Sequence, residues 1–469
     1  MKSRWTEGRA AQRLVSLSRP VEGLTPGQFL RAARGQERFY WREAGRPEVF
    51  AGFGAAAELK AWGRGRFAEI ERQARRLFSG AYIHAPGHAL AAPRLVGGFA
   101  FRDDFIPDEA WSAFHPAHFI LPHFQIAWSE GECRLTLNAL APAGEEVSAV
   151  CASLEEALEL RRRWLLREAG KAPANGRPET AARSGAGPVR LRYPMAAEDW
   201  ERMLRSALER IRAGELKKVV LARMCEVRAG SGIEIEPVLE SLDEAYPGCY
   251  RFLFEPRPGH AFVGATPELL VEVQGQELRT MALAGSIGRG HTEAEDAALR
   301  RELLESPKER HEHRLVVEAI RRRLDGWSAE KSFPRQPQVL ALSNIQHLHT
   351  PMQARLRRAE GVLPLAAHLH PTPALGGTPR ARALAFIRAE EPVTRGWYAG
   401  PVGWIGPELD GVFAVAIRSA VIQNERAWLY AGGGIVADSE PRREWQETAL
   451  KFRPVLRALG MESEVLSRA

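Results

Sequence analysis

The spacing of apolar residues along the chain predicts its principal helices and strands. Trp200, Met203, Leu204, Ala207, Leu208 and Ile211 recur at the interval of one helix face, so we expect an amphipathic helix that ends near Gly214. A strand follows at once in "LKKVVLARMCEV". Two more helices are expected at 306–324 and 440–459, and Pro454 should kink or break the second of them.

The remaining apolar runs are short and indicate strands. In the first part of the chain, "RLVGGFAF" and "FILPHFQIAW" are followed by a charged helix near 153–170, which is typical of an α+β arrangement. In the second part we expect strands in "YRFLFEP", "AFVGATPELLVEV", "ELRTMALAGSI", "GPVGWIG", "GVFAVAIRSAVIQ" and "AWLYAGGGIV". "LVGGFAF" and "YAGPVGW" are loosely alike and could be glycine-kinked strands from two halves of a duplicated β structure.

The domain organisation follows from length and from one change in composition. With 469 residues, the chain exceeds the roughly 250–300 residues at which one core usually stops growing. Residues 167–190 are rich in Gly, Pro and Ala and have no periodicity, which predicts a flexible linker. We therefore expect an N-terminal α+β part at 1–166 and a catalytic part at 191–469.

Composition and charge narrow the class of protein. Apolar residues make up 45% and charged ones 26%, as in ordinary globular enzymes. The net charge of +7 comes from scattered arginines, which favours a small anionic ligand over nucleic acid. Four cysteines without a CxxC pair argue against a disulfide framework and a zinc ribbon. With no signal-peptide pattern and no apolar run of about 18 residues, we expect a cytoplasmic protein that does not enter a membrane.

Two acidic pairs are candidates for metal ligands. Glu444 and Glu447 share one helix face with Lys451, and Glu309 and Glu312 form a second ExxE pair. Four carboxylates on two helices would supply the hard oxygen ligands that Mg²⁺ prefers. The alternatives remain open, because Glu309 stands at capping-box spacing from the N-cap Ser306, and the neighbouring pair Glu302 and Glu305 is typical of a solvated helix.

Lys218 and Glu268 are candidates for proton transfer. Lys218 shares a strand face with Val220 and Ala222, so it is either an edge lysine that reaches solvent or a desolvated lysine that acts as a base. Glu268 follows a Thr-Pro turn and is either an ordinary loop acid or the opposing general acid.

Glycines and histidines near these acids allow two readings each. Gly432, Gly433 and Gly434 match no nucleotide-binding motif, so they are either a plain strand-to-helix turn or a place where backbone N–H groups approach an anion. His311 and His313 lack the HExxH spacing of a zinc site, and we expect them on the surface.

Taken together, these segments resemble the chorismate-utilising enzymes, which include isochorismate synthases, salicylate synthases, anthranilate synthase large subunits and aminodeoxychorismate synthases. The matching pieces run in family order across Leu216–Phe452, whereas the N-terminal part is only loosely similar. They are "KKVVLAR", "FVGATPELL", "TMALAGSIGRG", "SPKERHEHRLVV", "NIQHLHT", "HPTPALGGTPR", "WYAGPVGW", "VFAVAIRSA" and "YAGGGIVADSEPRREWQETALKF". The resemblance implies an α+β fold like that of anthranilate synthase component I, with a large β-sandwich core flanked by helices.

The resemblance also assigns roles to residues. It implies Mg²⁺ held by Glu309, Glu312, Glu444 and Glu447, a catalytic base in Lys218 and a catalytic acid in Glu268. Substrate-binding positions are implied at Ala284, Gly285, Ser286, His347, Tyr398, Arg418, Gly432, Gly433, Gly434 and Lys451. Ser286 stands where the family usually has threonine, and the hydroxyl is retained.

Two positions separate the subfamilies. Members that add ammonia resemble one another in having glutamine where this chain has Lys218, and many aminodeoxychorismate synthases have a nucleophilic lysine where it has Ala284. The resemblance therefore implies an isochorismate synthase that adds water to C2 of chorismate and loses the C4 hydroxyl, without a glutaminase subunit. A salicylate synthase, an aminating subunit and an inactive chorismate-binding relative stay open. The pathway is either menaquinone, which we prefer, or a catechol siderophore.

Overall fold

A single hydrogen-bonded network of strands divides into two arms at strand β6 (Ala117–Ser129). The computed structural model describes residues 12–85, 87–142, 144–171 and 190–461. One edge of β6 pairs with β3 (Val49–Ala61), and its other edge pairs with β5 (Leu95–Phe99) and β7 (Glu132–Pro142). Because β6 pairs on both edges, β3 leads into one arm and β5 into the other.

The first arm runs from β3 to β9 and combines strands from distant parts of the chain. Its order is β3, β2 (Arg38–Arg42), β10 (Tyr250–Arg257), β11 (His260–Thr266), β20 (Ser419–Gln423), β21 (Arg426–Ile435) and β9 (Lys218–Arg228). The outer edge of β9 pairs with β8 (Arg190–Arg192) and β17 (Gly377–Thr378). All these pairs are antiparallel.

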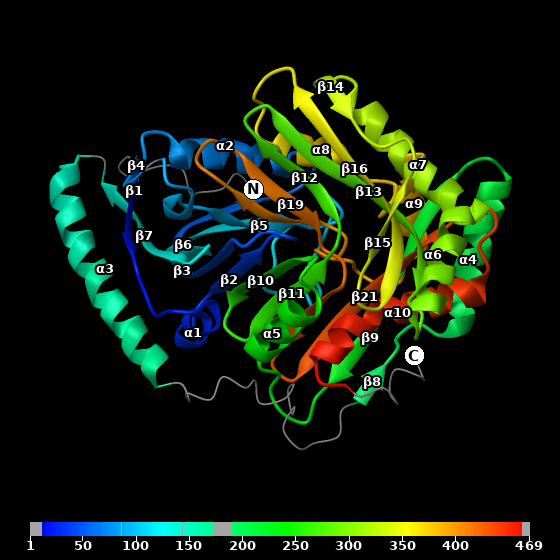
Figure 1. The fold of residues 1–469 in the computed structure, drawn as a ribbon, viewed down its shortest axis with the longest axis horizontal. Helices are drawn as coiled ribbons and strands as arrows, with labels where there is room; N and C mark the ends of the chain where they lie inside the picture. Colours follow the sequence, from blue (N-terminus) through cyan, green and yellow to red (C-terminus); the bar gives the residue numbers. More distant parts are fainter. Residues whose placement is uncertain (1–11, 86, 143, 172–189, 462–469) are drawn as a thin grey trace.

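The second arm runs from β5 to β16. Its order is β5, β18 (Pro401–Ile405), β19 (Gly411–Val415), β12 (Leu269–Gln274), β13 (Glu277–Gly288) and β16 (Ile345–Leu356), with β14 (Ser328–Ser332) and β15 (Gln338–Ala341) on the far edge. In Figure 1 the two arms diverge from the centre and end near each other on the right. β7 extends the sheet at the opposite end through β1 (Gln12–Pro20) and β4 (Tyr82–Ile83).

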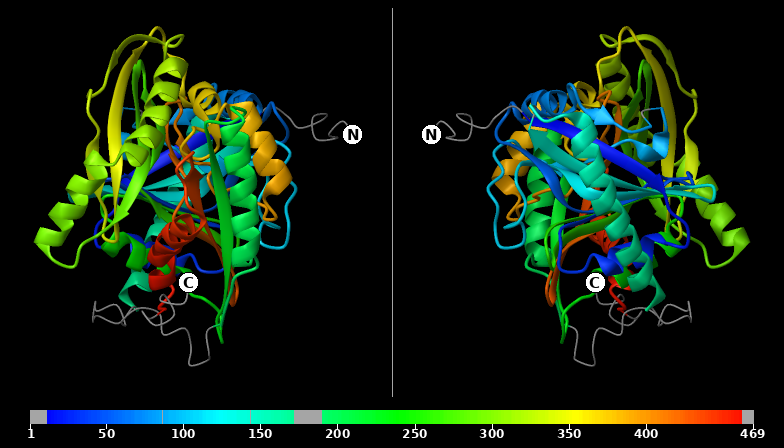
Figure 2. Two further views of the ribbon diagram at one scale, coloured as in Figure 1. Left: turned by 90° about the vertical axis from the view of Figure 1, so that its right-hand side faces the viewer. Right: turned by 90° about the vertical axis from the view of Figure 1, so that its left-hand side faces the viewer.

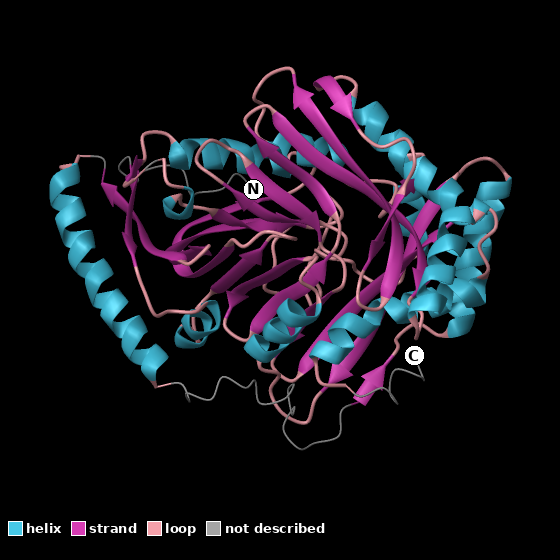
Figure 3. Cartoon of the chain, in the orientation of Figure 1, coloured by secondary structure: helices cyan, strands magenta, loops and turns pink. Residues whose placement is uncertain are grey.

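The alternation of side chains along the strands creates two cores. On β2, Phe39 and Trp41 point into a core shared by both arms, and Tyr40 points into a second core behind the first arm. Helices α1 (Pro26–Ala32), α3 (Val147–Gly170), α5 (Ile235–Ala245) and α10 (Pro441–Ala458) contribute to the second core. The predicted α+β fold, a large β-sandwich core flanked by helices, is confirmed, and Figure 3 shows the helices outside the strands.

Other helices cover the second arm and the ends of the molecule. α8 (Val362–Leu369) and α7 (Pro307–Leu324) pack on the second arm, α2 (Arg66–Phe78) packs on β3, β6 and α8, and α4 (Ala197–Arg212) and α9 (Arg380–Glu390) pack beside β9. α6 (Glu293–Glu305) precedes α7. The two side views look along the long axis, and α10 lies toward the viewer in one and α3 in the other (Figure 2).

Most of the predicted helices and strands are present, and some of their bounds differ from the prediction. Helix α10 continues through Pro454 to Ala458. Helix α3 extends to Gly170, into the first residues of the predicted linker, and residues 172–189 lie outside the described part of the chain. β5 and β18, which contain the two similar glycine segments, are direct neighbours, with Gly97 opposite Gly403. In the described residues, no helix is long and apolar enough to cross a membrane.

Candidate active site

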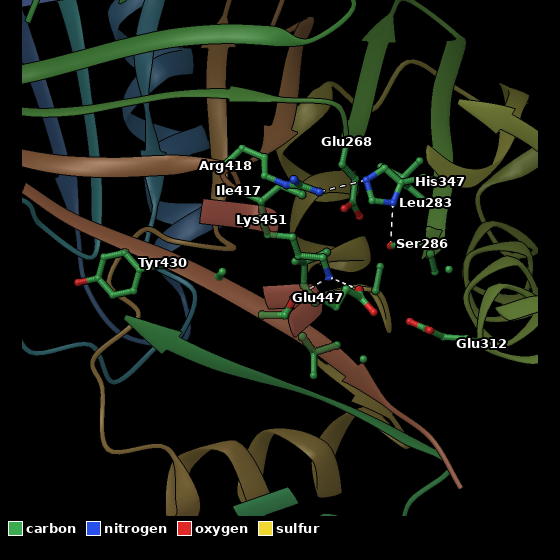
Figure 4. A pocket seen from close by; sticks show the side chains of 18 of the residues that line it. Glu268, Leu283, Ser286, Glu312, His347, Ile417, Arg418, Tyr430, Glu447 and Lys451 are labelled. Carbon is green, nitrogen blue, oxygen red and sulfur yellow. Dashed lines mark hydrogen bonds and ion pairs between the residues drawn. The ribbon is translucent and has the colours of Figure 1, made fainter. Parts of the chain in front are cut away.

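A cavity lies where the two arms end, and most of the predicted site residues line it, whereas Lys218, Glu309, Gly433 and Glu444 do not. The first arm contributes β9 and β21, the second arm contributes β13 and β16, and helices α7 and α10 flank the opening. Figure 4 shows Glu268, Ser286, Glu312, His347, Arg418, Glu447 and Lys451 around this space. The lining includes twelve predicted residues, namely Glu268, Ala284, Gly285, Ser286, Glu312, His347, Tyr398, Arg418, Gly432, Gly434, Glu447 and Lys451.

Helix α7 presents Glu309 and Glu312 to the site. The helix begins as the sequence predicts, because Ser306 accepts a hydrogen bond from the backbone N–H of Glu309 and Pro307 occupies the first turn. The Glu309 carboxylate does not complete a capping box, since its Oε2 accepts a hydrogen bond from the Ser286 backbone N–H at 2.9 Å. By contrast, Glu302 and Glu305 on α6 are exposed to solvent.

Helix α10 presents Glu444, Glu447 and Lys451 on one face, as the spacing predicts. Lys451 Nζ lies 2.6 Å from Glu447 Oε1 and donates to the Gly432 carbonyl at 2.8 Å. Glu444 Oε1 accepts a hydrogen bond from Lys308 Nζ at 2.9 Å, which joins α10 to α7. The two acidic helices therefore face each other across a short gap.

The proximity of these acids is visible in their protonation. Burial, together with Glu447, raises the pKa of Glu444 to about 7. Burial and the neighbouring Glu312 also raise the pKa of Glu309. Burial opposes ionisation of Glu447 as well, but the Lys451 ammonium outweighs it and holds the pKa of Glu447 below its ordinary value. A carboxylate raises the pKa of another carboxylate by charge repulsion, and this effect is strong only when the two lie near each other.

The carboxylates of Glu309, Glu312, Glu444 and Glu447 are suitable ligands for a hard divalent cation, although each of them contacts a lysine. Among the described residues, no three His, Cys, Asp or Glu side chains form a ready-made metal-binding group. Lys308 contacts Glu309 and Glu444, Lys218 contacts Glu312, and Lys451 contacts Glu447. Carboxylate oxygens on two facing helices match the ligands of Mg²⁺, so the residues present fit this ion once the acids turn from the lysines.

Lys218 lies inside the sheet rather than at an edge. It is the first residue of β9, which pairs with β21 on one side and β17 on the other, and its side chain is 0% exposed. Its Nζ is 2.8 Å from Glu312 Oε1, an ion pair without the alignment of a hydrogen bond. The alternative of a solvent-reaching edge lysine is therefore wrong.

The glycine run makes room for this ion pair. Gly432, Gly433 and Gly434 are strand residues of β21, opposite Ala222, Leu221 and Val220. A Cβ atom at Gly434 would lie 2.3 Å from Glu312 Oε1 and 2.9 Å from Lys218 Cε. The predicted strand-to-helix turn is wrong, because all three glycines lie within the strand. An approach of their backbone N–H groups to an anion stays a prediction. Gly433 faces the other way, toward Glu444 on α10.

Glu268 occupies the break between β11 and β12 and is buried. The predicted continuous strand at 261–273 is interrupted there, and the Glu268 side chain lines the cavity. Burial raises the pKa of Glu268 to about 8, although the ammonium groups of Lys218 and Lys451 favour its ionised form. At neutral pH this residue is consequently a carboxylic acid that can give up a proton.

A β-bulge in β13 shapes the opposite wall. The register between β13 and β16 shifts between Leu283 and Ser286, and Gly285 within the bulge has a φ of +83°. The bulge brings Ala284, Gly285 and Ser286 into the lining together. A side chain at Gly285 would also crowd Glu309, whose backbone oxygen would be 3.2 Å from a Cβ atom.

A directed hydrogen-bond chain connects Arg418, His347 and Ser286. Arg418 Nη2 lies 3.1 Å from His347 Nε2, and His347 Nδ1 lies 2.9 Å from Ser286 Oγ (Figure 4). Burial, then the charges of Arg418 and Lys451, hold the pKa of His347 far below its ordinary value, so the ring is neutral. Because arginine only donates, Nε2 accepts and Nδ1 carries the proton. Ser286 Oγ then accepts from His347, and no hydrogen bond from its own O–H is found among the residues that the structure describes.

Arg418 and two tyrosines complete the polar end of the cavity. Arg418 interrupts the predicted strand at 411–423, has a φ of +53°, and its Nη1 has no hydrogen-bond partner within the described chain. Its guanidinium is thus available to an anion. Tyr398 stacks on Tyr430 at 5.3 Å between ring centroids. The Tyr430 hydroxyl points away from the other labelled side chains (Figure 4) and accepts a hydrogen bond from Trp111 Nε1.

Sequence reasoning missed several residues of the site. His313 is buried, so the prediction that it lies on the surface is wrong. Its Nδ1 lies 3.1 Å from the Ala284 carbonyl oxygen, and its Nε2 lies 2.7 Å from Thr350 Oγ1. It thereby connects α7 to the bulge, whereas His311 is exposed as predicted. Leu283 and Ile417 line the cavity, and Lys308 bridges the acidic helices. The sequence did not indicate that Lys308 contacts Glu309, because the side chains of adjacent helix residues usually point in different directions.

The fold and this site define a chorismate-utilising enzyme scaffold, and comparison with known proteins agrees. A family model described as "Chorismate binding enzyme" matches residues 2–460, and the chain belongs to this family. The chain is 40% identical to the "Salicylate biosynthesis isochorismate synthase" of Pseudomonas aeruginosa, covering 96% of this chain and 92% of that protein. It is 34% identical to "Isochorismate synthase MenF" of Bacillus subtilis, covering 96% and 94%.

A solved structure supports the same assignment. The structure of MenF, described as the menaquinone-specific isochorismate synthase from Escherichia coli, superposes with a TM-score of 0.75 at 26% identity. The match covers 96% of this chain and 95% of that protein, so it includes the N-terminal part that the sequence motifs matched only loosely.

Proposed function

We propose that this chain is an isochorismate synthase that converts chorismate to isochorismate. The proposal is carried by two buried groups, namely Lys218, whose amine contacts the cavity-lining Glu312, and Glu268, a cavity-lining carboxylic acid that keeps its proton at neutral pH. A base and an acid in one enclosed site divide the proton transfers of a hydroxyl exchange. The isochorismate synthases among the relatives support the same activity.

In this mechanism Lys218 takes a proton from the water that attacks C2, and Glu268 protonates the departing C4 hydroxyl. Glu312 Oε1 lies 2.8 Å from Lys218 Nζ, so the base role requires Glu312 to be drawn from Lys218 to another cation. Arg418, Lys451 and Ser286 line the cavity. In the proposal, Arg418 and Lys451 receive the substrate's carboxylates, and the Ser286 O–H donates a hydrogen bond to the substrate.

Mg²⁺ is the proposed cofactor, held by Glu309, Glu312, Glu444 and Glu447. When bound, it would neutralise and orient a substrate carboxylate as a Lewis acid. No glutaminase subunit is proposed, because Lys218 stands where ammonia-using relatives of the resemblance have glutamine. Nucleic acid and membranes have no part in the proposal.

The experiment that tests the function is a product assay with chorismate and Mg²⁺. We expect isochorismate, independent of added ammonium, and we expect Lys218→Ala to abolish turnover while Mg²⁺-dependent chorismate binding stays measurable. Salicylate with pyruvate would instead identify a salicylate synthase, and ammonium-dependent product would identify an aminating enzyme. Near-normal isochorismate formation by Lys218→Ala would refute the assigned base.

A further inference from the structure

Lys308 places a positive charge between the two acidic helices. It lies on α7, next to Glu309, and its Nζ is 2.9 Å from Glu444 Oε1 on α10 and 3.3 Å from Glu309 Oε1. The ammonium therefore contacts one member of each ExxE pair. Glu444 is almost fully buried, with 1% of its side chain exposed, so this carboxylate has little access to water as an alternative partner.

Lys308 differs from the other lysines of the site. Lys218 is fully buried behind the cavity-lining Glu312, and Lys451 lines the cavity; the proposed function gives each of these two lysines a task. Lys308 does not line the cavity, and 25% of its side chain is exposed to solvent. Its flexible stem can thus carry the ammonium outward without crossing the substrate space.

The same oxygens cannot serve both cations. A divalent ion that both helices hold through Glu444 Oε1 and Glu309 Oε1 would bind the oxygens that now face the Lys308 ammonium. Two cations within contact distance of one carboxylate repel each other strongly in a poorly solvated site. Metal binding consequently requires the lysine to leave.

We propose that Lys308 is a tethered competitor of the divalent cation. It balances Glu309 and Glu444 and holds α7 to α10 in the metal-free protein, and it turns to solvent when the metal binds. Lys308 thereby lowers the affinity of the site for the metal and keeps the acids from repelling each other in its absence. This inference rests on the metal site of the proposed function.

The test is a calorimetric titration of Mg²⁺ into the full-length protein, without substrate. We expect Lys308→Met to bind Mg²⁺ about tenfold more tightly than the wild type, because the site loses its internal cation. We also expect a lower melting temperature of the metal-free variant and a larger rise on adding Mg²⁺. Lys308→Arg, which keeps the charge, should bind Mg²⁺ no more tightly than the wild type.

Two controls separate the possible failures. Lys331→Met removes an equally exposed lysine, 25% exposed and paired with Asp325, and should leave Mg²⁺ affinity unchanged. Glu444→Gln should abolish binding in either background. If the wild type binds Mg²⁺ and Glu444→Gln does not, but Lys308→Met binds equally or more weakly, the competition is wrong and the metal site stands. If Glu444→Gln binds like the wild type, the metal site and this inference both fall.

Discussion

At the scale of single residues, the account depends on a carboxylic acid that stays protonated at neutral pH. Glu268 has a pKa of about 8 because it is buried. We therefore expect kcat/KM to fall as the pH rises through about 8, when the acid loses its proton. Glu268→Gln should lose turnover at every pH. A pH profile that stays flat from 7 to about 9 would contradict the assignment of Glu268 as the acid.

Burial of Glu268 should also lower the free energy of unfolding, which can be measured independently of activity. Above its unfolded pKa near 4.5, the folded protein holds a proton that the unfolded chain releases, so stability declines as the pH rises from there to about 8. Glu268→Gln should raise the free energy of unfolding at pH 7 by up to about 3 kcal/mol. Denaturation at pH 7 and at pH 4 checks this, because the gain should disappear at the lower pH.

The hydrogen-bond chain through His347 predicts that two substitutions act as one. Ser286→Ala removes the O–H that faces the ligand, and His347→Gln keeps an acceptor for Arg418 but loses the N–H beside Ser286. Each should lower kcat/KM by about 10²-fold. The double variant should be little worse than His347→Gln alone, and additive losses in a double-mutant cycle would show that Ser286 acts independently.

At the scale of elements, β21 is shaped to leave room for charged side chains. Gly434→Ala would push a Cβ atom into Glu312 and Lys218. We expect at least about 10²-fold loss of kcat, with a folded protein by circular dichroism. Gly433→Ala, on the other strand face, meets Glu444 Oε2 at 3.3 Å and should lose less activity. Equal activity of Gly434→Ala and the wild type would contradict the packing.

Elements also show where sequence reasoning succeeds and where it stops. Ser306 and Pro307 fix the start of α7, and the apolar stripe of α4 fixes its face, because these signals are local. Glu268 and Arg418 lie in breaks within two predicted strands. Such breaks depend on tertiary contacts, which the local sequence does not show. Nothing local marks Lys308, whose partner Glu444 lies on another helix.

At the scale of the whole molecule, the N-terminal part supplies strands to the same hydrogen-bonded network as the catalytic part. β2 pairs with β10 and β5 pairs with β18, so residues 12–142 cover edges that the remainder would otherwise expose. The family motifs lie in the second part of the chain, across Leu216–Phe452. They could not predict this pairing, because the N-terminal strands contribute packing rather than catalytic side chains.

This arrangement predicts that the catalytic part does not stand alone. A fragment of residues 191–469 should aggregate, because β10 and β18 would present unpaired edges. Co-expression with residues 1–171 should restore soluble protein and activity. Size-exclusion chromatography of the fragment is the measurement, and a monomeric, active fragment would show that the two parts are independent domains.

The central claim is that water, deprotonated at Lys218, supplies the new hydroxyl. The most direct measurement is mass spectrometry of the product formed from chorismate and Mg²⁺ in oxygen-18 water. The account predicts isochorismate with one oxygen-18 atom in its C2 hydroxyl, and no such product from Lys218→Ala. Isochorismate without the label would mean that the hydroxyl migrates within the substrate, and the account would be wrong.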